Sequence, residues 1–208
     1  DGTFGITGEC KQLSSDEIEK LEKHELNKVD VLYWRNSKIN FDSLNSLVSS
    51  LEKKTDNEFL KKINDCEDEK VLKYLIKNNN DLKIRHSNDY IKTLWECCQI
   101  PDFSKKAYGN HIEVVKKVFE FLISKTGKVT NDYMKKQLKD LDKYDGNIDT
   151  LTNRISNIRT WSYVANKKGW ASNSDYWIER TKYIEDKLSD KLHEELTKSF
   201  IDRRISVL

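Results

Sequence analysis

The 208-residue chain is poor in the residues that interrupt helices, with one proline and seven glycines. Proline removes a backbone donor and glycine costs conformational entropy, so their scarcity favours long helices over a fold of tight turns. Long apolar runs are missing as well, because no segment approaches the roughly 18 consecutive apolar residues of a membrane span. Since 35% of the residues are charged, we expect amphipathic helices, a mainly α fold and no membrane partner.

Cysteine is scarce, and its spacing supports neither a disulfide framework nor a metal site. The four cysteines form no Cys-x-x-Cys pair, and the four histidines are scattered along the chain. A structural zinc site needs ligands at a spacing that allows tetrahedral coordination. We therefore expect no metal, and buried thiols in a reducing cytoplasm. The four thiols are those of Cys10, Cys66, Cys97 and Cys98.

Net positive charge is also small, at +2, which argues against a dedicated polyanion-binding protein. The charge is unevenly distributed, since residues 1–100 sum to −3 and residues 101–208 to +5. Any contact with a nucleic acid should therefore lie in the second half of the chain. Five of the seven arginines lie there too. Arginine both binds phosphates in a bidentate manner and pairs with carboxylates on helices, so the two roles remain open.

The N-terminal part of the sequence predicts one short strand and one helix. Residues 2–7 are glycine-rich and alternate with β-prone residues, which is typical of a strand that needs a partner sheet. Ser14 and Glu17 have the spacing of a capping box, which predicts a helix running to about Leu26. Residues 29–34 are the only other strand-like run, and their pattern is ambiguous.

From Phe41 onward, apolar residues recur at the helical period, which predicts a bundle of helices. Ser87 or Asn88 should cap one of these helices, and Asp149 should cap another. The last helix should run from about residue 175 to 204, roughly 45 Å at 1.5 Å per residue. Its apolar stripe consists of Trp177, Ile184, Leu188, Leu192, Leu196 and Phe200.

Nothing in the sequence itself argues for catalysis. Residues 124–129 have some features of a phosphate-binding loop. However, Leu122 replaces its first glycine and Val129 replaces the Ser or Thr that would hold magnesium. No Ser-His-Asp or Cys-His set has local support. We therefore expect no catalytic residue and no bound cofactor in this chain.

Residues 154–180 interleave basic and aromatic side chains, a pattern that suits single-stranded nucleic acid. Arg154 and Trp161 lie two turns apart on one helix face, and Arg159 and Tyr163 share another. The opposing interpretation is that the tryptophans are core residues that anchor the last two helices together. Both interpretations remain open for the basic residues. The candidate nucleic-acid-binding residues are Arg154, Arg159, Trp161, Tyr163, Lys167, Lys168, Arg203 and Arg204.

Segments in order along nearly the whole chain resemble the region after the second RecA-like domain in Suv-three-type helicases, especially the alphaproteobacterial members. One reads Asp-Gly-Thr-Phe-Gly-Ile-Thr-Gly at 1–8, and another reads Leu-Trp-Glu-Cys-Cys-Gln-Ile-Pro-Asp-Phe at 94–103. The other similar segments are 31–36 with 41–44, 145–151, 158–164, 177–181, 184–190 and 200–204.

This resemblance implies a superfamily 2 DExH enzyme that unwinds RNA or RNA–DNA hybrids with ATP and magnesium. The arginine-finger motif of the family comes just before the segment at 1–8, so the nucleotide-binding residues should be absent here. Residues 1–36 would connect to the RecA-like motor, with their strand completing its second sheet. Residues 37–208 would form the helical C-terminal domain, which in the family packs against the motor and helps to enclose the departing single strand.

We therefore expect a helical bundle that follows a short N-terminal strand belonging to a preceding RecA-like domain. The chain would be a non-catalytic, cytoplasmic piece of an RNA helicase, and its partners would be single-stranded or duplex RNA and the RecA-like domains. The absence of an initiator methionine and of a signal sequence agrees with a piece of a longer protein. The alternatives are a helical module that docks a ribonuclease or another partner, and an independent enzyme with a deep polar pocket.

Overall fold

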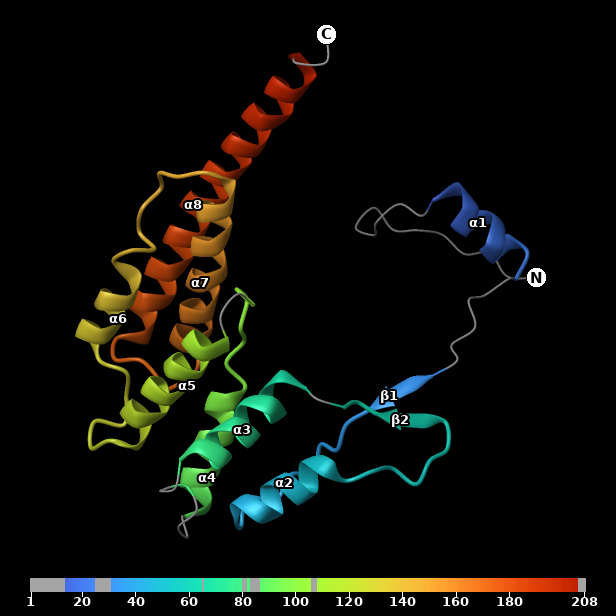
Figure 1. Ribbon diagram of the computed structural model, residues 1–208, viewed down its shortest axis with the longest axis vertical. Coiled ribbons are helices and arrows are strands. Elements are labelled where there is room, and N and C mark those ends of the chain that lie inside the picture. The colour runs from blue at the N-terminus through green and yellow to red at the C-terminus, as the bar shows by residue number, and fades with distance from the viewer. Residues whose placement is uncertain are drawn as a thin grey trace. The chain divides into compact units, whose positions relative to one another are not determined.

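A computed structural model describes residues 14–24, 31–64, 66–79, 82, 87–105 and 108–205, the side chains of 108 and 202–205 excepted. These residues form eight helices and two three-residue strands (Figure 1), so the predicted mainly α fold is confirmed. The chain divides into two compact units, Asp1–Arg35 with Lys54–Ile63, and Asn36–Lys53 with Asn64–Leu208. In the described ranges, no helix is both long and apolar enough for a membrane crossing.

The first unit contains helix α1 (Ser15–Glu22), which opens with the predicted capping box. The Ser14 hydroxyl accepts from the Glu17 amide at 3.3 Å, and the Glu17 carboxylate accepts from the Ser14 amide at 2.8 Å. The helix ends at Glu22, before the predicted end at Leu26, and His24 follows with a left-handed φ of 56°. The strand predicted at 2–7 lies outside the described residues.

Two short strands, β1 (Leu32–Trp34) and β2 (Leu60–Lys62), pair in parallel in the same unit. Leu32 lies opposite Leu60 in this register. The ambiguous run at 29–34 thus contains a strand, whereas β2 was not predicted. Its pairing joins Lys54–Ile63 to the first unit, although the sequence pattern placed those residues within the helical domain.

The second unit is a set of helices, several of which are capped at their first turn by a polar side chain. The hydroxyl of Ser43 accepts a bond from the Ser46 amide at 3.0 Å, and Ser87 caps its helix as predicted. Thr130 acts in the same way. The helices are α2 (Leu44–Glu52), α3 (Glu67–Asn78), α4 (Asn88–Cys98), α5 (Tyr108–Ile123), α6 (Asn131–Leu138), α7 (Ile148–Asn166) and α8 (Ser174–Ile205).

The cap of α7 differs from the one predicted at Asp149. Asn147 is the N-cap, and its Oδ1 accepts from the Thr150 amide at 2.9 Å. An N-cap side chain reaches the amide two or three residues ahead, and the helix begins at Ile148, so Asp149 lies two residues beyond the cap position, inside the helix. Asp149 instead places a negative charge in the first turn, where it interacts favourably with the positive end of the helix dipole.

Helices α7 and α8 lie side by side and run in opposite directions through the middle of the second unit (Figure 1). Ile158 and Val164 of α7 are fully buried, as are Ile184 and Leu188 of α8. Burial of such side chains removes apolar surface from water and is the dominant favourable contribution to folding. The helix pair therefore forms the centre of the core.

Helix α8 is much longer than the helix on which it packs. It has 32 residues against 19 in α7, which corresponds to roughly 48 Å against 28 Å. The predicted apolar stripe is therefore buried only in part: Trp177, Ile184 and Leu188 lie in the core, while Leu196 is 47% exposed and Phe200 is exposed as well. The stripe continues past the end of its partner helix.

A short backbone bridge fixes α6 next to the start of α8. The Val129 amide donates to the Trp170 carbonyl at 2.7 Å, and the Ser172 amide donates to the Val129 carbonyl at 2.9 Å. Trp170 and Ala171, in the turn between α7 and α8, are buried at this bridge. Because α6 begins two residues after Val129, its N-terminal turn is held beside that of α8.

The thiols of Cys97 and Cys98 are buried in α4, as predicted. Burial raises the pKa of both thiols, because a thiolate loses its hydration in the core. Cys66 is half-buried, and Cys10 lies outside the described residues. The two α4 cysteines therefore behave as small apolar core residues.

The overhang of α8 predicts opposite effects for two leucines on the same helix. Leu188→Ala should lower the free energy of unfolding by about 2–5 kcal/mol, because it opens a cavity in the core. Leu196→Ala should change it by less than about 0.5 kcal/mol, because that side chain is half-exposed. Urea denaturation followed by circular dichroism measures both. Equal losses would contradict the burial pattern of α8.

Candidate nucleic-acid interface

Two arginines predicted to bind nucleic acid are engaged within the protein. Arg154 Nη1 donates to the carbonyl of Lys143 at 2.8 Å and to that of Asp145, and its side chain is only 16% exposed. Arg159 Nε donates to Glu185 Oε1 at 2.7 Å and so links α7 to α8, with half of its side chain exposed. Arg154 therefore anchors the loop before α7, and Arg159 is the more accessible of the two.

The aromatic candidates on α7 differ in their surroundings. Trp161 is buried, and its ring packs against that of Tyr133 with centroids 5.8 Å apart. Tyr163 is half-buried and meets Trp170 edge-on. Lys167 Nζ lies 5.3 Å from the centre of the Tyr163 ring. In this structure Trp161 belongs to the core, as in the second interpretation of the sequence, and its ring is not accessible to a base.

The remaining candidates are Lys168, Arg203 and Arg204. Lys168 is exposed just after the end of α7. The side chains of Arg203 and Arg204 lie outside the described residues. Among the described candidates, Tyr163 and Lys167 form a cation–π contact. Arg159, Tyr163 and Lys167 follow one another along one face of α7, while Trp161 lies in the core and Arg154 is held by the loop before the helix, so only part of the predicted set remains accessible.

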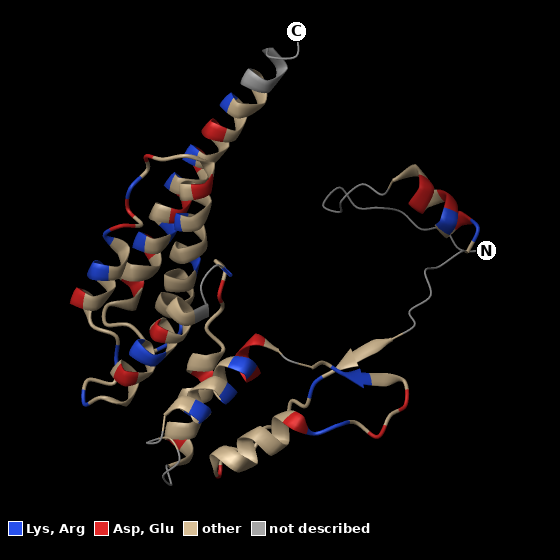
Figure 2. Ribbon diagram, viewed as in Figure 1, with Lys and Arg blue, Asp and Glu red and all other residues tan. Residues whose placement is uncertain are grey.

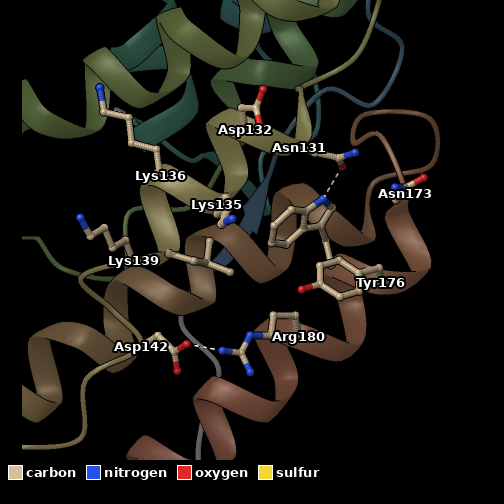
Figure 3. Close-up of a pocket in the computed structure, with 11 residues that line it drawn as sticks. Asn131, Asp132, Lys135, Lys136, Lys139, Asp142, Asn173, Tyr176 and Arg180 are labelled. Atoms are coloured by element: carbon tan, nitrogen blue, oxygen red, sulfur yellow. Dashed lines mark hydrogen bonds and ion pairs between the residues drawn. The ribbon is translucent and has the colours of Figure 1, made fainter.

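A pocket between α6 and the first turns of α8 does bring such side chains together (Figure 3). It has a volume of about 950 Å³. Its lining is apolar at Leu138 and Trp177 and polar elsewhere. The full lining comprises Asn131, Asp132, Lys135, Lys136, Leu138, Lys139, Asp142, Asn173, Tyr176, Trp177 and Arg180.

Two lysines of α6 and the lysine at its C-cap supply positive charge to this pocket. Lys135, Lys136 and Lys139 are exposed, and Figure 2 shows the basic positions along α6. Within the part of the chain that the structure describes, none of them has a carboxylate oxygen within 4.0 Å. Ammonium groups without an internal counter-ion remain available for a phosphate.

Arg180 contributes a fourth cation, which is held in place by neighbours. Its Nη2 donates to Asp142 Oδ2, and its guanidinium lies 5.4 Å from the centre of the Tyr183 ring. Tyr144 donates its hydroxyl to the other oxygen of Asp142. Burial, together with this bond to the carboxylate, raises the pKa of Tyr144 to about 12. Asp142 thus restrains Arg180 through one of its guanidinium nitrogens.

Two aromatic side chains and an amide shape the opposite side of the pocket. Trp177 Nε1 donates to Asn131 Oδ1 at 2.9 Å, which fixes the orientation of the amide. The Tyr176 ring meets Trp177 edge-on, with centroids 4.8 Å apart. Tyr176 is nevertheless 57% exposed. An accessible aromatic ring beside unpaired lysines is the combination that binds single-stranded nucleic acids.

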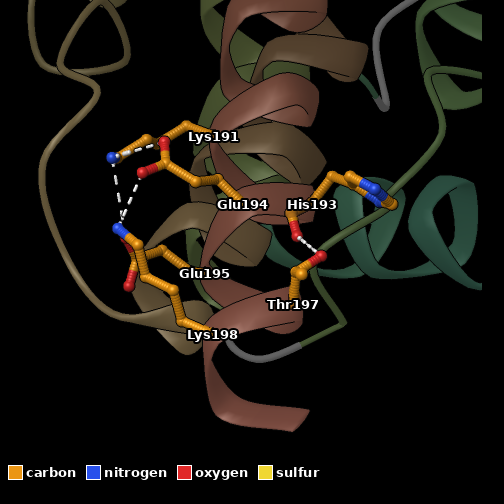
Figure 4. Close-up of polar contacts among 6 residues, drawn as sticks. All are labelled: Lys191, His193, Glu194, Glu195, Thr197 and Lys198. Carbon is orange, nitrogen blue, oxygen red and sulfur yellow. Dashed lines mark hydrogen bonds and ion pairs between the residues drawn. The ribbon is translucent and has the colours of Figure 1, made fainter. Parts of the chain in front are cut away.

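The distal half of α8 is also rich in lysine, but there the charges neutralise one another (Figure 4). Lys198 Nζ lies 2.7 Å from Glu194 and 3.0 Å from Glu195, and Lys191 lies 2.8 Å from Glu194. Hydrogen bonds from Lys191 and then Lys198 lower the pKa of Glu194 to about 2. These lysines therefore offer little net positive charge to an external phosphate.

Comparisons with known proteins do not bear on this pocket. No family model matches the chain, and the searches of curated proteins and of solved structures returned no match. Within the described ranges, no cluster of three or more His, Cys, Asp or Glu side chains has the arrangement of a metal site. The resemblance to Suv-three-type helicases therefore rests on the sequence segments alone.

The sequence contained a signal for this pocket that the prediction missed. Lys135 and Lys139 are four residues apart, so they share one face of a helix. Tyr176 and Arg180 have the same spacing on α8. Periodicity alone does not say that these two faces meet, because the bridge at Val129 that aligns the helices is a tertiary contact.

The bonds of Arg154 predict a structural role that can be separated from that of Arg159. Arg154→Ala should lower the free energy of unfolding by about 1–2 kcal/mol, since two loop carbonyls lose a charged donor. Arg159→Ala should cost about 0.5 kcal/mol, because it removes an exposed ion pair. Urea denaturation of both variants provides the comparison. A loss for Arg154→Ala no larger than for Arg159→Ala would rule out the anchoring role.

Proposed function

We propose that this chain is an RNA-binding helical module of a cytoplasmic ATP-dependent helicase. In this proposal ATP and magnesium bind to RecA-like domains of the parent protein, and the module contacts RNA that leaves the motor. The observation that carries the proposal is the surplus of unpaired lysines on α6 beside the accessible ring of Tyr176. Cations hold phosphates and an aromatic ring stacks on a base, so together they suit RNA.

The resemblance to Suv-three-type helicases gives this proposal its second support. One of the similar segments, at 177–181, includes Trp177 and Arg180, which both line the pocket. Another, at 145–151, includes Asp145, whose carbonyl binds Arg154, and the α7 cap Asn147. One of the segments that suggest an RNA helicase thus includes two residues of the pocket, and another includes residues that order the loop before α7.

The distal half of α8 favours a second candidate function, the docking of a partner protein such as a ribonuclease. Leu196 and Ile201 are about half-exposed there. Exposed apolar side chains on a helix can form the centre of a protein interface. The intrahelical pairs of Lys191 and Lys198 would then supply a polar rim.

Removal of two α6 lysines tests the proposed function. Lys135→Ala/Lys139→Ala should weaken the binding of a labelled single-stranded RNA roughly tenfold or more at low salt, because two phosphate contacts are lost. The slope of log affinity against log salt should fall by about 1.4, or 0.7 for each contact. Fluorescence anisotropy at several salt concentrations measures both quantities.

The matched control is Lys191→Ala/Lys198→Ala, which removes two lysines that already pair with glutamates. This control should bind RNA like the unaltered chain. Equal weakening in both variants would mean that RNA affinity depends only on the total charge of the chain. No binding by the unaltered chain at low salt would contradict the proposed function. Circular dichroism should show that both variants retain their helical content.

A further inference from the structure

Tyr176 is held at the mouth of the α6–α8 pocket in a way that suits a stacking platform (Figure 3). Its ring meets the buried Trp177 at 76°, an edge-to-face contact that restrains its position. Trp177 is in turn fixed by its bond to Asn131. More than half of Tyr176 remains accessible although the ring is restrained. Because the ring is already ordered, little conformational entropy would be lost when a base stacks on it, and the affinity would be correspondingly higher.

Asn131 adds a polar group of known orientation to the same pocket. An indole nitrogen can only donate a hydrogen bond, so the atom that accepts from Trp177 must be the amide oxygen. The amide nitrogen of Asn131 is left with two donors, and Asn131 is exposed where it lines the pocket. A fixed donor beside a stacking ring can bond an acceptor on the edge of a base.

We infer that this pocket binds one unpaired nucleotide of RNA. Its base stacks on Tyr176 and accepts a bond from Asn131, and its phosphate lies between Lys135 and Lys139. The inference rests on the proposed function, since it takes RNA as the ligand, and it adds that the site selects unpaired nucleotides. Arg180 and Asp142, which are bonded to each other, line the end of the pocket next to the loop that follows α6.

The aromatic side of the pocket is what separates a single strand from a duplex. In a duplex each base is stacked on both faces, so only phosphates reach the lysines. In a single strand a base can leave the stack and lie on a protein ring. Lysines alone would bind both forms through phosphates, and Tyr176 should add affinity for the unpaired form only. An acidic peptide would use the lysines without requiring the ring.

The test compares Tyr176→Leu with Tyr176→Phe on three RNA probes. The probes are a labelled 12-nucleotide single strand, a blunt hairpin duplex, and a 12-nucleotide strand of abasic residues. Tyr176→Leu should weaken binding of the single strand roughly five- to hundredfold, since stacking is lost. It should leave the duplex and the abasic strand within about twofold of the unaltered chain. Tyr176→Phe keeps the ring and should bind all three probes like the unaltered chain.

Each other outcome has a distinct meaning. If Lys135→Ala/Lys139→Ala weakens RNA binding but Tyr176→Leu does not, the nucleotide pocket is wrong and the RNA-binding function stands. Equal losses on the single and abasic strands would also overturn the pocket, because they would show that no base is recognised. If the unaltered chain binds an acidic peptide and no RNA, both proposals fail. Thermal melting of the two Tyr176 variants, expected to match the unaltered chain, excludes misfolding as the cause.

Discussion

Burial of Ile184 and Leu188 in the packing of α8 on α7 is the interaction on which the rest of the second unit depends. It fixes the rotation of α8 about its own axis. Side chains three or four residues apart share a helix face, so Tyr176, Arg180 and Tyr183 must form a neighbouring face that the core does not cover. The exposed tyrosines and the partly exposed arginine agree with this placement.

The lysines of α6 make no direct ion pair with the described residues, whereas Lys191 and Lys198 of distal α8 do. Distal α8 continues beyond its partner helix. Its lysines and glutamates are spaced by three and four residues, so they form ion pairs along the helix surface. Helix α6 has eight residues, with Asp132 as its one acidic side chain. It therefore carries a local excess of positive charge next to α8.

Much of the fold could be predicted from local sequence, because caps and apolar periodicity act within a few residues. The capping box at Ser14 and the cap at Ser87 are of this kind. The site was harder to predict, because it depends on which helix faces meet. Clustering of basic and aromatic residues at 154–180 pointed to α7, yet Trp161 is buried and Arg154 bonds to a loop. The same composition serves packing or binding, and only tertiary contacts separate the two.

The small net charge of +2 is a weak guide to phosphate binding in this chain. At physiological ionic strength exposed charges are screened within about 8 Å, so a phosphate responds to the side chains around it rather than to the total. On distal α8 each lysine shown in Figure 4 has a glutamate within 3 Å, so the net charge of this group of side chains is close to zero. Helix α6 carries two lysines, Lys135 and Lys136, against the single acidic side chain of Asp132, and Lys139 follows as its C-cap. A chain that is nearly neutral overall can therefore present a local excess of positive charge to a phosphate, because acidic side chains farther away than the screening length contribute little there.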